Sequence, residues 1–302
     1  MRAAAILGLG SSRRDLDPFR RDTNHEFEMG LPDSSAGLDA ILIFGGDGTI
    51  HRHLGALVRL RLPVLVVPTG SGNDFSRALG IRRRRDSLLA WQIFAKHRSN
   101  RREIDLGVIT SPLDSGQPKV KHHFACVAGV GLDADIARRA NKLPRWLRRS
   151  GGYALVFPSS LMRFTPFPLT LSVPRRDLDA KDEFEVRRRG PTMLAAVANT
   201  PFYGDGMKIA PNARFDDGEL DICLIEGMAP FKLFCMFPSV YFGRHLGIKE
   251  VEYFRASAAR LETEAPLDVY ADGEFVCRTP VEFSVADRAL TVIIPENPRL
   301  RG

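Results

Sequence analysis

Cysteine is scarce in this sequence, with four residues in 302. No two of them form a Cys-x-x-Cys pair, and none stands at a ligand spacing from a histidine. Disulfide frameworks and zinc sites depend on such spacings, so the pattern favours reduced thiols in strands or core. The cysteines concerned are Cys126, Cys223, Cys235 and Cys277.

Long apolar runs are also absent. No stretch approaches the roughly 18 consecutive apolar residues of a transmembrane helix. The apolar run at residues 1–8 is short and carries one positive charge, so it favours a first strand over a signal peptide. We expect a cytoplasmic protein, and 44% apolar residues in 302 suffice for two domains.

Positive charge is in excess, with a formal net charge of +7 and an isoelectric point near 9.5. Motifs for binding RNA or DNA and interleaved aromatic residues are missing, so we expect no nucleic acid partner. Two interpretations stay open: peripheral contact with an anionic membrane surface, or solvated loops. The arginine runs lie at residues 82–85, 98–102, 145–149 and 187–189.

Two glycine-rich turns each follow a β-branched apolar run, at residues 45–49 and 68–75. Such runs are typical of parallel strands covered on both faces, and helical patterns follow both turns. The turns should therefore lie side by side at the carboxyl edge of one sheet, where open α/β folds bind ligands. Glycine allows backbone N–H groups to face a phosphate directly.

A carboxylate beside a phosphate makes sense if it holds a divalent cation or a water bound to that cation. Asp47 and Asp74 are therefore candidate magnesium ligands. The predicted nucleotide contacts are Gly45, Gly46, Asp47, Gly48, Thr49, Thr69, Gly70, Ser71, Asn73 and Asp74.

With these two turns the sequence resembles the diacylglycerol kinase catalytic family, soluble lipid kinases that include the sphingosine kinases. Residues 124–134, 197–225 and 269–295 match further landmarks of that family in order, so the resemblance covers most of the chain. It implies an ATP-dependent, Mg²⁺-requiring kinase that phosphorylates the hydroxyl of diacylglycerol or a similar lipid. It also implies an α/β nucleotide-binding domain with a parallel sheet, similar to NAD kinase and phosphofructokinase.

The nucleotide half departs from the family pattern at two places. An Asn-Pro-x-x-Gly turn is replaced by residues 8–13, and an Asn-Glu pair is replaced by His51-Arg52. Gly10 and Ser11, with Arg13, could form a different cradle for phosphates, or the turn could merely link two segments. The strand before the first glycine turn begins near residue 40, earlier than two full βα units allow, so the domain is shortened at its N-terminus.

From residue 103 onward, short strands separated by turn signals predict a β-sandwich, giving an α/β nucleotide-binding domain 1–102 and a lipid-substrate domain 103–302. An alternative stays open in which the C-terminal residues pack back on the first domain. Residues 175–190 are expected to form a mobile hairpin or loop, and residues 231–242 a helix that lines a lipid pocket or covers the core. Other predicted helices are 50–60, 75–79, 88–96, 133–142 and 153–162. Predicted strands are 3–7, 40–44, 63–67, 103–109, 122–127, 169–173, 193–197, 220–225, 267–270, 275–277, 281–285 and 290–294.

Two acidic turns remain. Asp272-Gly273 reads by itself as an ordinary hairpin turn. The resemblance implies that Glu274 accepts the proton of the lipid hydroxyl, with Asp272 orienting it or holding metal-bound water. It also implies a structural Mg²⁺ at Asp217; by composition alone, the turn at residues 216–221 could equally be solvated.

Two rival functions stay open: an NAD kinase-like enzyme, and a non-catalytic protein that binds lipid or nucleotide. A homodimer also stays open. The NAD kinase reading expects an Asn-Glu pair after the first glycine turn, and none is present.

Overall fold

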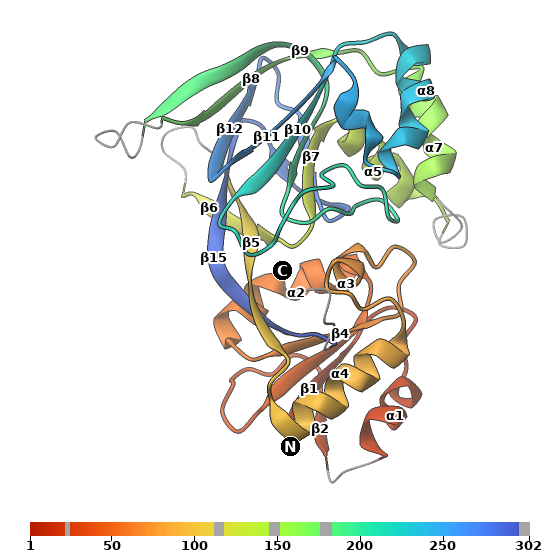
Figure 1. The fold of residues 1–302 in the computed structure, drawn as a ribbon, viewed down its shortest axis with the longest axis vertical. Helices are drawn as coiled ribbons and strands as arrows, with labels where there is room; N and C mark the ends of the chain where they lie inside the picture. Colours follow the sequence, from red (N-terminus) through yellow and green to blue (C-terminus); the bar gives the residue numbers. More distant parts are fainter. Residues whose placement is uncertain (22–24, 112–117, 145–151, 176–182, 296–302) are drawn as a thin grey trace. The chain divides into compact units, whose positions relative to one another are not determined.

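The structure is a computed structural model of residues 1–302 that describes all except residues 22–24, 112–117, 145–151, 176–182 and 296–302. The chain divides into two compact units (Figure 1). Unit 1 comprises Met1–Asp105 and the segment from Asp287 onward, and unit 2 comprises Leu106–Ala286. The division falls at Asp105, where the sequence predicted residue 102, and the chain returns to unit 1 after Ala286.

Unit 1 contains a parallel sheet in the order β2-β1-β3-β4, with the end of β15 beside β4. Every residue of β3 and β4 is buried, as their continuous apolar sequences require of strands covered on both faces. The strands are β1 (Arg2–Leu7), β2 (Glu26–Met29), β3 (Ala40–Gly45), β4 (Val64–Pro68) and β15 (Val281–Ile293). The predicted parallel sheet is confirmed, and β2 is a strand that the sequence did not reveal.

The helices of unit 1 follow the strands. α2 buries Ile50, Leu54 and Leu57, which share one face of the helix. It begins at Asp47 rather than at residue 50, because the aspartate, glycine and threonine of the first glycine turn form its first helical turn. The elements are η1 (Arg13–Leu16), α1 (Asp17–Arg20), α2 (Asp47–Leu60), α3 (Asp74–Ala78) and α4 (Arg84–His97).

Unit 2 is built on antiparallel strands in the order β14-β13-β7-β9-β8-β12-β15, with β10 between β9 and β11, and β5 beside β6 and β15. One apolar core includes Phe124, Leu171, Val197, Leu261 and Phe283. The strands are β5 (Arg101–Ser111), β6 (Val120–Phe124), β7 (Val127–Gly131), β8 (Phe167–Pro174), β9 (Phe184–Ala198), β10 (Leu220–Glu226), β11 (Val251–Ala256), β12 (Ala258–Thr263), β13 (Asp268–Ala271) and β14 (Glu274–Arg278).

Two predictions for unit 2 are wrong. The strand expected at 122–127 is two strands, β6 and β7, because the amides of Ala125 and Cys126 bond to a side chain instead of a neighbouring strand. The strands expected at 281–285 and 290–294 are one strand, β15. Of the hairpin or loop expected at residues 175–190, the hairpin is confirmed, because residues 184–190 belong to β9, which pairs antiparallel with β8, while residues 176–182 lie outside the described residues.

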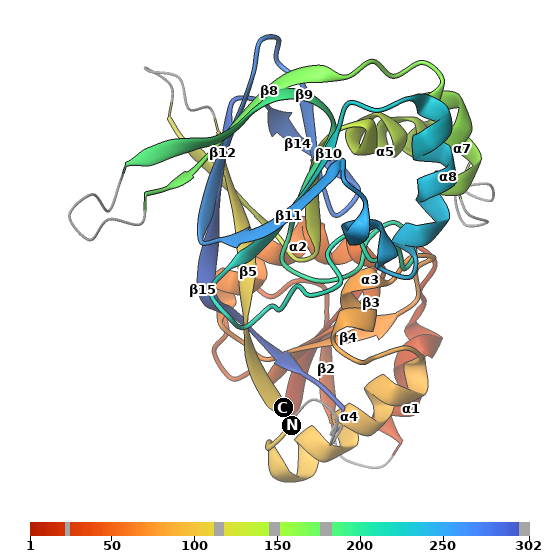
Figure 2. The ribbon, with the colours of Figure 1, turned by 45° about the horizontal axis from the view of Figure 1, so that its top comes forward.

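Three helices of unit 2 lie side by side, α5 (Leu132–Lys142), α7 (Gly152–Leu161) and α8 (Pro230–Val240) (Figure 2). Their bounds agree with the predicted helices to within two residues at each end. A short 3-10 helix, η2 (Arg244–Gly247), follows α8. Within the described residues, no helix combines the length and apolarity that crossing a membrane requires.

Candidate functional site

Three turns converge at the carboxyl edge of the parallel sheet in unit 1. The first turn is tied to the second, because Gly8 N donates to Phe44 O at 2.7 Å and Ser11 Oγ donates to the same oxygen at 3.0 Å. It is also tied to the third turn, because Ser11 Oγ lies 2.8 Å from Thr69 Oγ1. The altered first turn, with its Gly10 at φ +90°, is therefore hydrogen-bonded to both glycine turns.

The glycines of these turns allow close packing of the backbone. A Cβ atom on Gly8 or Gly45 would lie 2.4 or 2.5 Å from side-chain atoms of Thr49. A Cβ atom on Gly70 would lie 2.6 Å from the Cα of Gly46. These glycines are needed to bring the turns together, whether or not their amides also face a ligand.

Asp47 joins the second turn to the third. Its Oδ2 accepts a hydrogen bond from Asp74 N at 3.0 Å, and its Oδ1 accepts one from Phe75 N at 3.0 Å. These are the first amides of α3, which lack partners within the helix. Asp74 is buried and forms an ion pair with Arg77, a residue that the sequence analysis did not single out.

Asn73 closes the third turn on itself. It adopts a left-handed conformation with φ of 54°, its Oδ1 accepts from Gly70 N at 3.0 Å, and its Nδ2 donates to Gly70 O at 2.7 Å. Ser71 is exposed at the tip of the same turn. The predicted nucleotide residues are thus brought together, and several of them hold the turns in shape.

The carboxylates of the two glycine turns, Asp47 and Asp74, suit a metal ion that binds together with a nucleotide. Among the described residues, no three His, Cys, Asp or Glu side chains form a metal-binding cluster. Mg²⁺ commonly takes one or two carboxylates and completes its shell with substrate phosphates and water. Asp47 accepts the two amide bonds described above, and its carboxylate is the type of group that takes part in such a shell.

In unit 2, Asp272 and Gly273 form the two-residue turn between β13 and β14, with φ of 51° and 84°. Two successive positive φ values are what a type I′ hairpin turn requires. The carboxylate of Asp272 accepts hydrogen bonds from Ala125 N at 2.9 Å and Cys126 N at 2.8 Å. Asp272 therefore anchors this turn to the break between β6 and β7.

Glu274 is the first residue of β14, and its side chain is exposed. It makes no hydrogen bond or ion pair with the described residues. Of the two carboxylates predicted to be catalytic, Glu274 is thus the accessible one, and Asp272 is the one that holds the turn.

A fully buried carboxyl group, that of Asp221, follows the acidic turn as the second residue of β10. Tyr253 donates a hydrogen bond to Oδ1 of Asp221, while Oδ2 has no hydrogen-bond partner among the described residues. Burial raises the pKa of Asp221 to about 6, and the charge of Asp217 contributes in the same direction. The acidic side chains here do not form a metal-binding cluster within the described residues, and Arg255, 3.4 Å from Asp217, offsets part of their charge.

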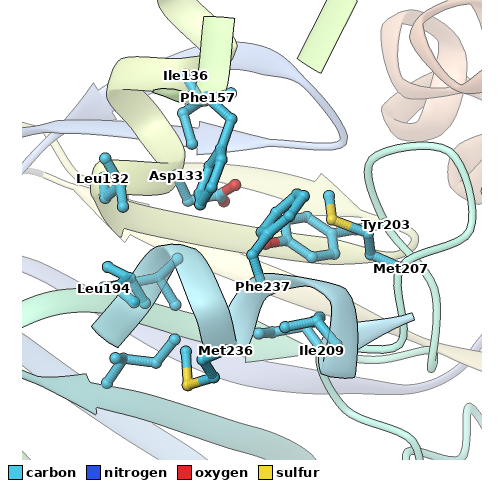
Figure 3. A pocket seen from close by; sticks show the side chains of 13 residues that line it. Leu132, Asp133, Ile136, Phe157, Leu194, Tyr203, Met207, Ile209, Met236 and Phe237 are labelled. Carbon is cyan, nitrogen blue, oxygen red and sulfur yellow. The ribbon is translucent and has the colours of Figure 1, made fainter. Parts of the chain in front are cut away.

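A small apolar cavity lies among α5, α7 and α8 (Figure 3). Its lining includes Ile136, Phe157, Met236 and Phe237, and the rings of Phe157 and Phe237 stack at 3.8 Å. The predicted helix at 231–242 therefore does line a pocket. The cavity measures about 30 Å³, which is room for water but not for an acyl chain.

Asp133 is the one charged residue that lines this cavity. It makes no hydrogen bond or ion pair with the described residues, and burial raises its pKa to about 7. Sequence analysis missed it as a site residue. The available signal was an acid inside the apolar segment 127–137.

The outer faces of α7 and α8 expose large apolar side chains. We call this set the aromatic face; it consists of Leu155, Met162, Phe231, Phe234 and Phe242, exposed by 50–79%. Neither segment 152–164 nor segment 230–245 contains an acidic residue.

Several arginines from the predicted basic runs are engaged in ion pairs. Arg84 pairs with Asp15, Arg98 with Asp39, Arg187 with Glu252 and Arg188 with Glu226. The run at 145–149 lies outside the described residues.

Residues 21–109 match the sequence model of the Diacylglycerol kinase catalytic domain, and residues 126–294 match that of the YegS C-terminal NAD kinase beta sandwich-like domain. A Diacylglycerol kinase of Mycobacterium tuberculosis is 33% identical over 261 residues, which cover 86% of this chain and 78% of that protein. The Putative lipid kinase YtlR of Bacillus subtilis is 29% identical, with coverage of 84% and 80%.

Two solved structures share the fold. A putative diacylglycerol kinase from Bacillus anthracis superposes with a TM-score of 0.69 at 22% identity, covering 99% of this chain and 98% of that chain. An NAD kinase from Archaeoglobus fulgidus in complex with ATP superposes with a TM-score of 0.54 at 16% identity, covering 98% and 94%. The predicted fold class, an α/β unit followed by a sandwich-like unit, is confirmed.

Proposed function

The chain belongs to the family of diacylglycerol kinase-like lipid kinases, and we propose that it transfers the γ-phosphoryl group of ATP to the hydroxyl of diacylglycerol or a similar lipid. The observation that carries this proposal is the convergence of three tied turns at the carboxyl edge of the parallel sheet in unit 1. That edge is where α/β folds bind nucleotides.

ATP binding rests on the backbone of the two glycine turns. Their amides would face the phosphates, while Asp47 and Asn73 keep the turns at the required separation. Ser11 would act through Thr69, since its hydroxyl is bonded within the protein. The related fold of an NAD kinase in complex with ATP supports this assignment.

Mg²⁺ would be held by the phosphate oxygens together with Asp47 and Asp74, and when bound it would neutralise charge on the transferred group. A second Mg²⁺ would have a structural role in unit 2. Its ligands there would be the Asp217 carboxylate and backbone carbonyls of the acidic turn, beside the buried Asp221.

Glu274 would receive the proton of the lipid hydroxyl. The hydroxyl oxygen forms a bond to the γ-phosphorus, the bond from that phosphorus to ADP breaks, and the proton passes to the Glu274 carboxylate. A carboxylate is a weak base for an alcohol, but a loose transition state calls for proton transfer only late in the reaction. Asp272 would keep the turn that carries Glu274 in place.

The lipid would be recognised in unit 2. Because burial raises the pKa of Asp133 to about 7, its neutral form can donate a hydrogen bond to an ester or hydroxyl oxygen in the apolar cavity. An acyl chain would require α7 and α8 to separate, because the cavity holds only about 30 Å³. The aromatic face on these helices would contact the membrane that supplies the lipid.

A non-catalytic binding protein is the second candidate, and one observation favours it. Asp47, Asp74 and Asp272 all bond within the protein, so their presence does not by itself indicate catalysis. Glu274 has no such structural contact, and its presence favours the enzyme.

Incubation with radiolabelled ATP, Mg²⁺ and a total lipid extract tests the proposal. We expect label in a lipid, and the labelled species identifies the substrate. ATP binding without any labelled lipid would instead support the binding protein.

A further inference from the structure

Helix α5 contacts both the apolar cavity and the hairpin that carries Glu274. Asp133 and Ile136, near its start, line the cavity (Figure 3). Ala134 and Ala137 pack against Tyr270 of β13. The two sets lie on adjoining faces of one helix, because the members of each set are three residues apart.

At the other end of α5, Asn141 reaches the turn of the hairpin. Its Nδ2 donates a hydrogen bond to the carbonyl oxygen of Gly273 at 2.8 Å. Gly273 lies directly between Asp272 and Glu274, so this bond acts one residue before the proposed proton acceptor. Ala134, Ala137 and Asn141 share a helical face, at spacings of three and four residues.

The β13–β14 hairpin makes more contacts on the side of β7 than on the side of β14. On the side of β7, Asp272 bonds to the Ala125 and Cys126 amides. β14, however, is the edge strand of the sheet, and both Glu274 and Phe275 are exposed. Among the described strands, Glu274 is paired only with Ala271 of β13, and the bond from Asn141 to Gly273 adds a contact at the turn beside it.

The buried end of α5 is also in contact with the strand next to the hairpin. The Asp133 carboxyl lies against Gly129 of β7, where an added Cβ would be 2.0 Å from its Oδ2. Gly129 is paired in register with Tyr270 of β13. A shift of Asp133 is thus transmitted to β13 through both α5 and β7.

We propose that Asn141 is a positioning residue for Glu274, and that α5 couples occupancy of the apolar cavity to the position of the Glu274 hairpin. This inference rests on the proposed function for its effect on turnover. A ligand that displaces or bonds Asp133 moves α5, and Asn141 carries that movement to Gly273. Lipid binding and placement of the proton acceptor then occur together.

The test compares Asn141→Ala and Asn141→Asp with the control Lys142→Ala, which alters the next, exposed residue of the same helix. Short-chain diacylglycerol serves as the substrate. Loss of the donor should lower kcat by ~5–20-fold with KM changed less than about twofold, since a misplaced group slows the reaction more than binding. Lys142→Ala should match wild type. An unchanged kcat in both Asn141 variants, or an equal loss in Lys142→Ala, overturns the positioning role.

Hydrogen exchange of the amides at residues 270–275 provides a readout that does not require turnover. We expect faster exchange there in Asn141→Ala, and slower exchange in wild type, but not in Asn141→Ala, when short-chain diacylglycerol is added. Exchange that is equal in wild type and Asn141→Ala contradicts the inference even if the protein is not a kinase. Absence of any labelled lipid in the transfer assay contradicts the proposed function alone.

Discussion

The Asp272 carboxylate accepts hydrogen bonds from two successive backbone amides, those of Ala125 and Cys126. In Asp272→Asn one of these amides would face an NH₂ group and lose its acceptor. A buried donor left without a partner costs about 1–3 kcal/mol, so the free energy of unfolding should fall by that amount. Urea denaturation measures it.

The matched control for this prediction is Asp268→Asn in the same hairpin. Asp268 forms a largely exposed pair with Arg278, and its loss should cost about 0–1 kcal/mol. If Asp272→Asn were no less stable than Asp268→Asn, the anchoring role of Asp272 would be wrong.

The raised pKa of Asp133 makes stability depend on pH. The folded protein keeps the proton up to pH about 7, whereas the unfolded chain releases it near pH 4. Between these values the folded state binds more protons, so stability falls as the pH rises through this window. The loss should reach about 4 kcal/mol at pH 8 relative to pH 4.

Asp133→Asn should remove this component, because an amide does not titrate. Denaturant unfolding of both proteins from pH 5 to pH 8 measures the difference, which should grow in favour of the variant as the pH rises. A constant difference across this range would mean that folding does not raise the pKa of Asp133.

At the residue scale, the sequence singled out candidate site residues but did not reveal the hydrogen bonds that they make. Asp47 and Asp272 stood beside glycines and were read as metal or catalytic groups. Their hydrogen-bond partners lie 27 and 146 residues away, so no local pattern could reveal the anchoring role. Asn141 was missed for the same reason, since its bond to Gly273 forms only when α5 packs. Asp133 was missed although it stands as an acid within an apolar segment.

Helices α7 and α8 supply the prediction at the scale of elements. Phe231 and Phe242 are exposed by 79% and 72%, and burying each in a membrane would contribute about 1.5–3 kcal/mol. Phe231→Ser/Phe242→Ser should therefore lower partition into anionic vesicles by at least ~10-fold. Vesicle sedimentation measures this partition.

Leu89→Ser is the control for this variant, because Leu89 is 54% exposed on α4 of unit 1 and is not part of the aromatic face. It should sediment as wild type does. Equal partition of the double variant and wild type would assign any membrane contact to another surface.

Elements with a continuous apolar pattern were predicted well, and elements defined by tertiary contacts were not. β3, β4 and the three helices of unit 2 follow from their own sequences. The break between β6 and β7 depends on Asp272, far along the chain. The charged start of β9 looked like a loop, but its arginines bond across the sheet, as Arg187 does to Glu252.

At the scale of the whole molecule, the ordered landmarks of the sequence identified the family and the fold class, an α/β part followed by a sandwich-like part. The family landmarks do not separate catalysis from binding, because the aspartates of both units also hold the backbone. Glu274 is the residue on which that distinction depends.

The most direct measurement is the rate of γ-phosphoryl transfer to lipid by Glu274→Gln, compared with wild type and with Glu264→Gln, an exposed carboxylate of the same unit. Loss of a positioned general base should reduce the rate by at least ~10²-fold while ATP binding and thermal stability stay unchanged. Glu264→Gln should label the lipid as wild type does. Transfer by Glu274→Gln at a rate near that of wild type would contradict the account.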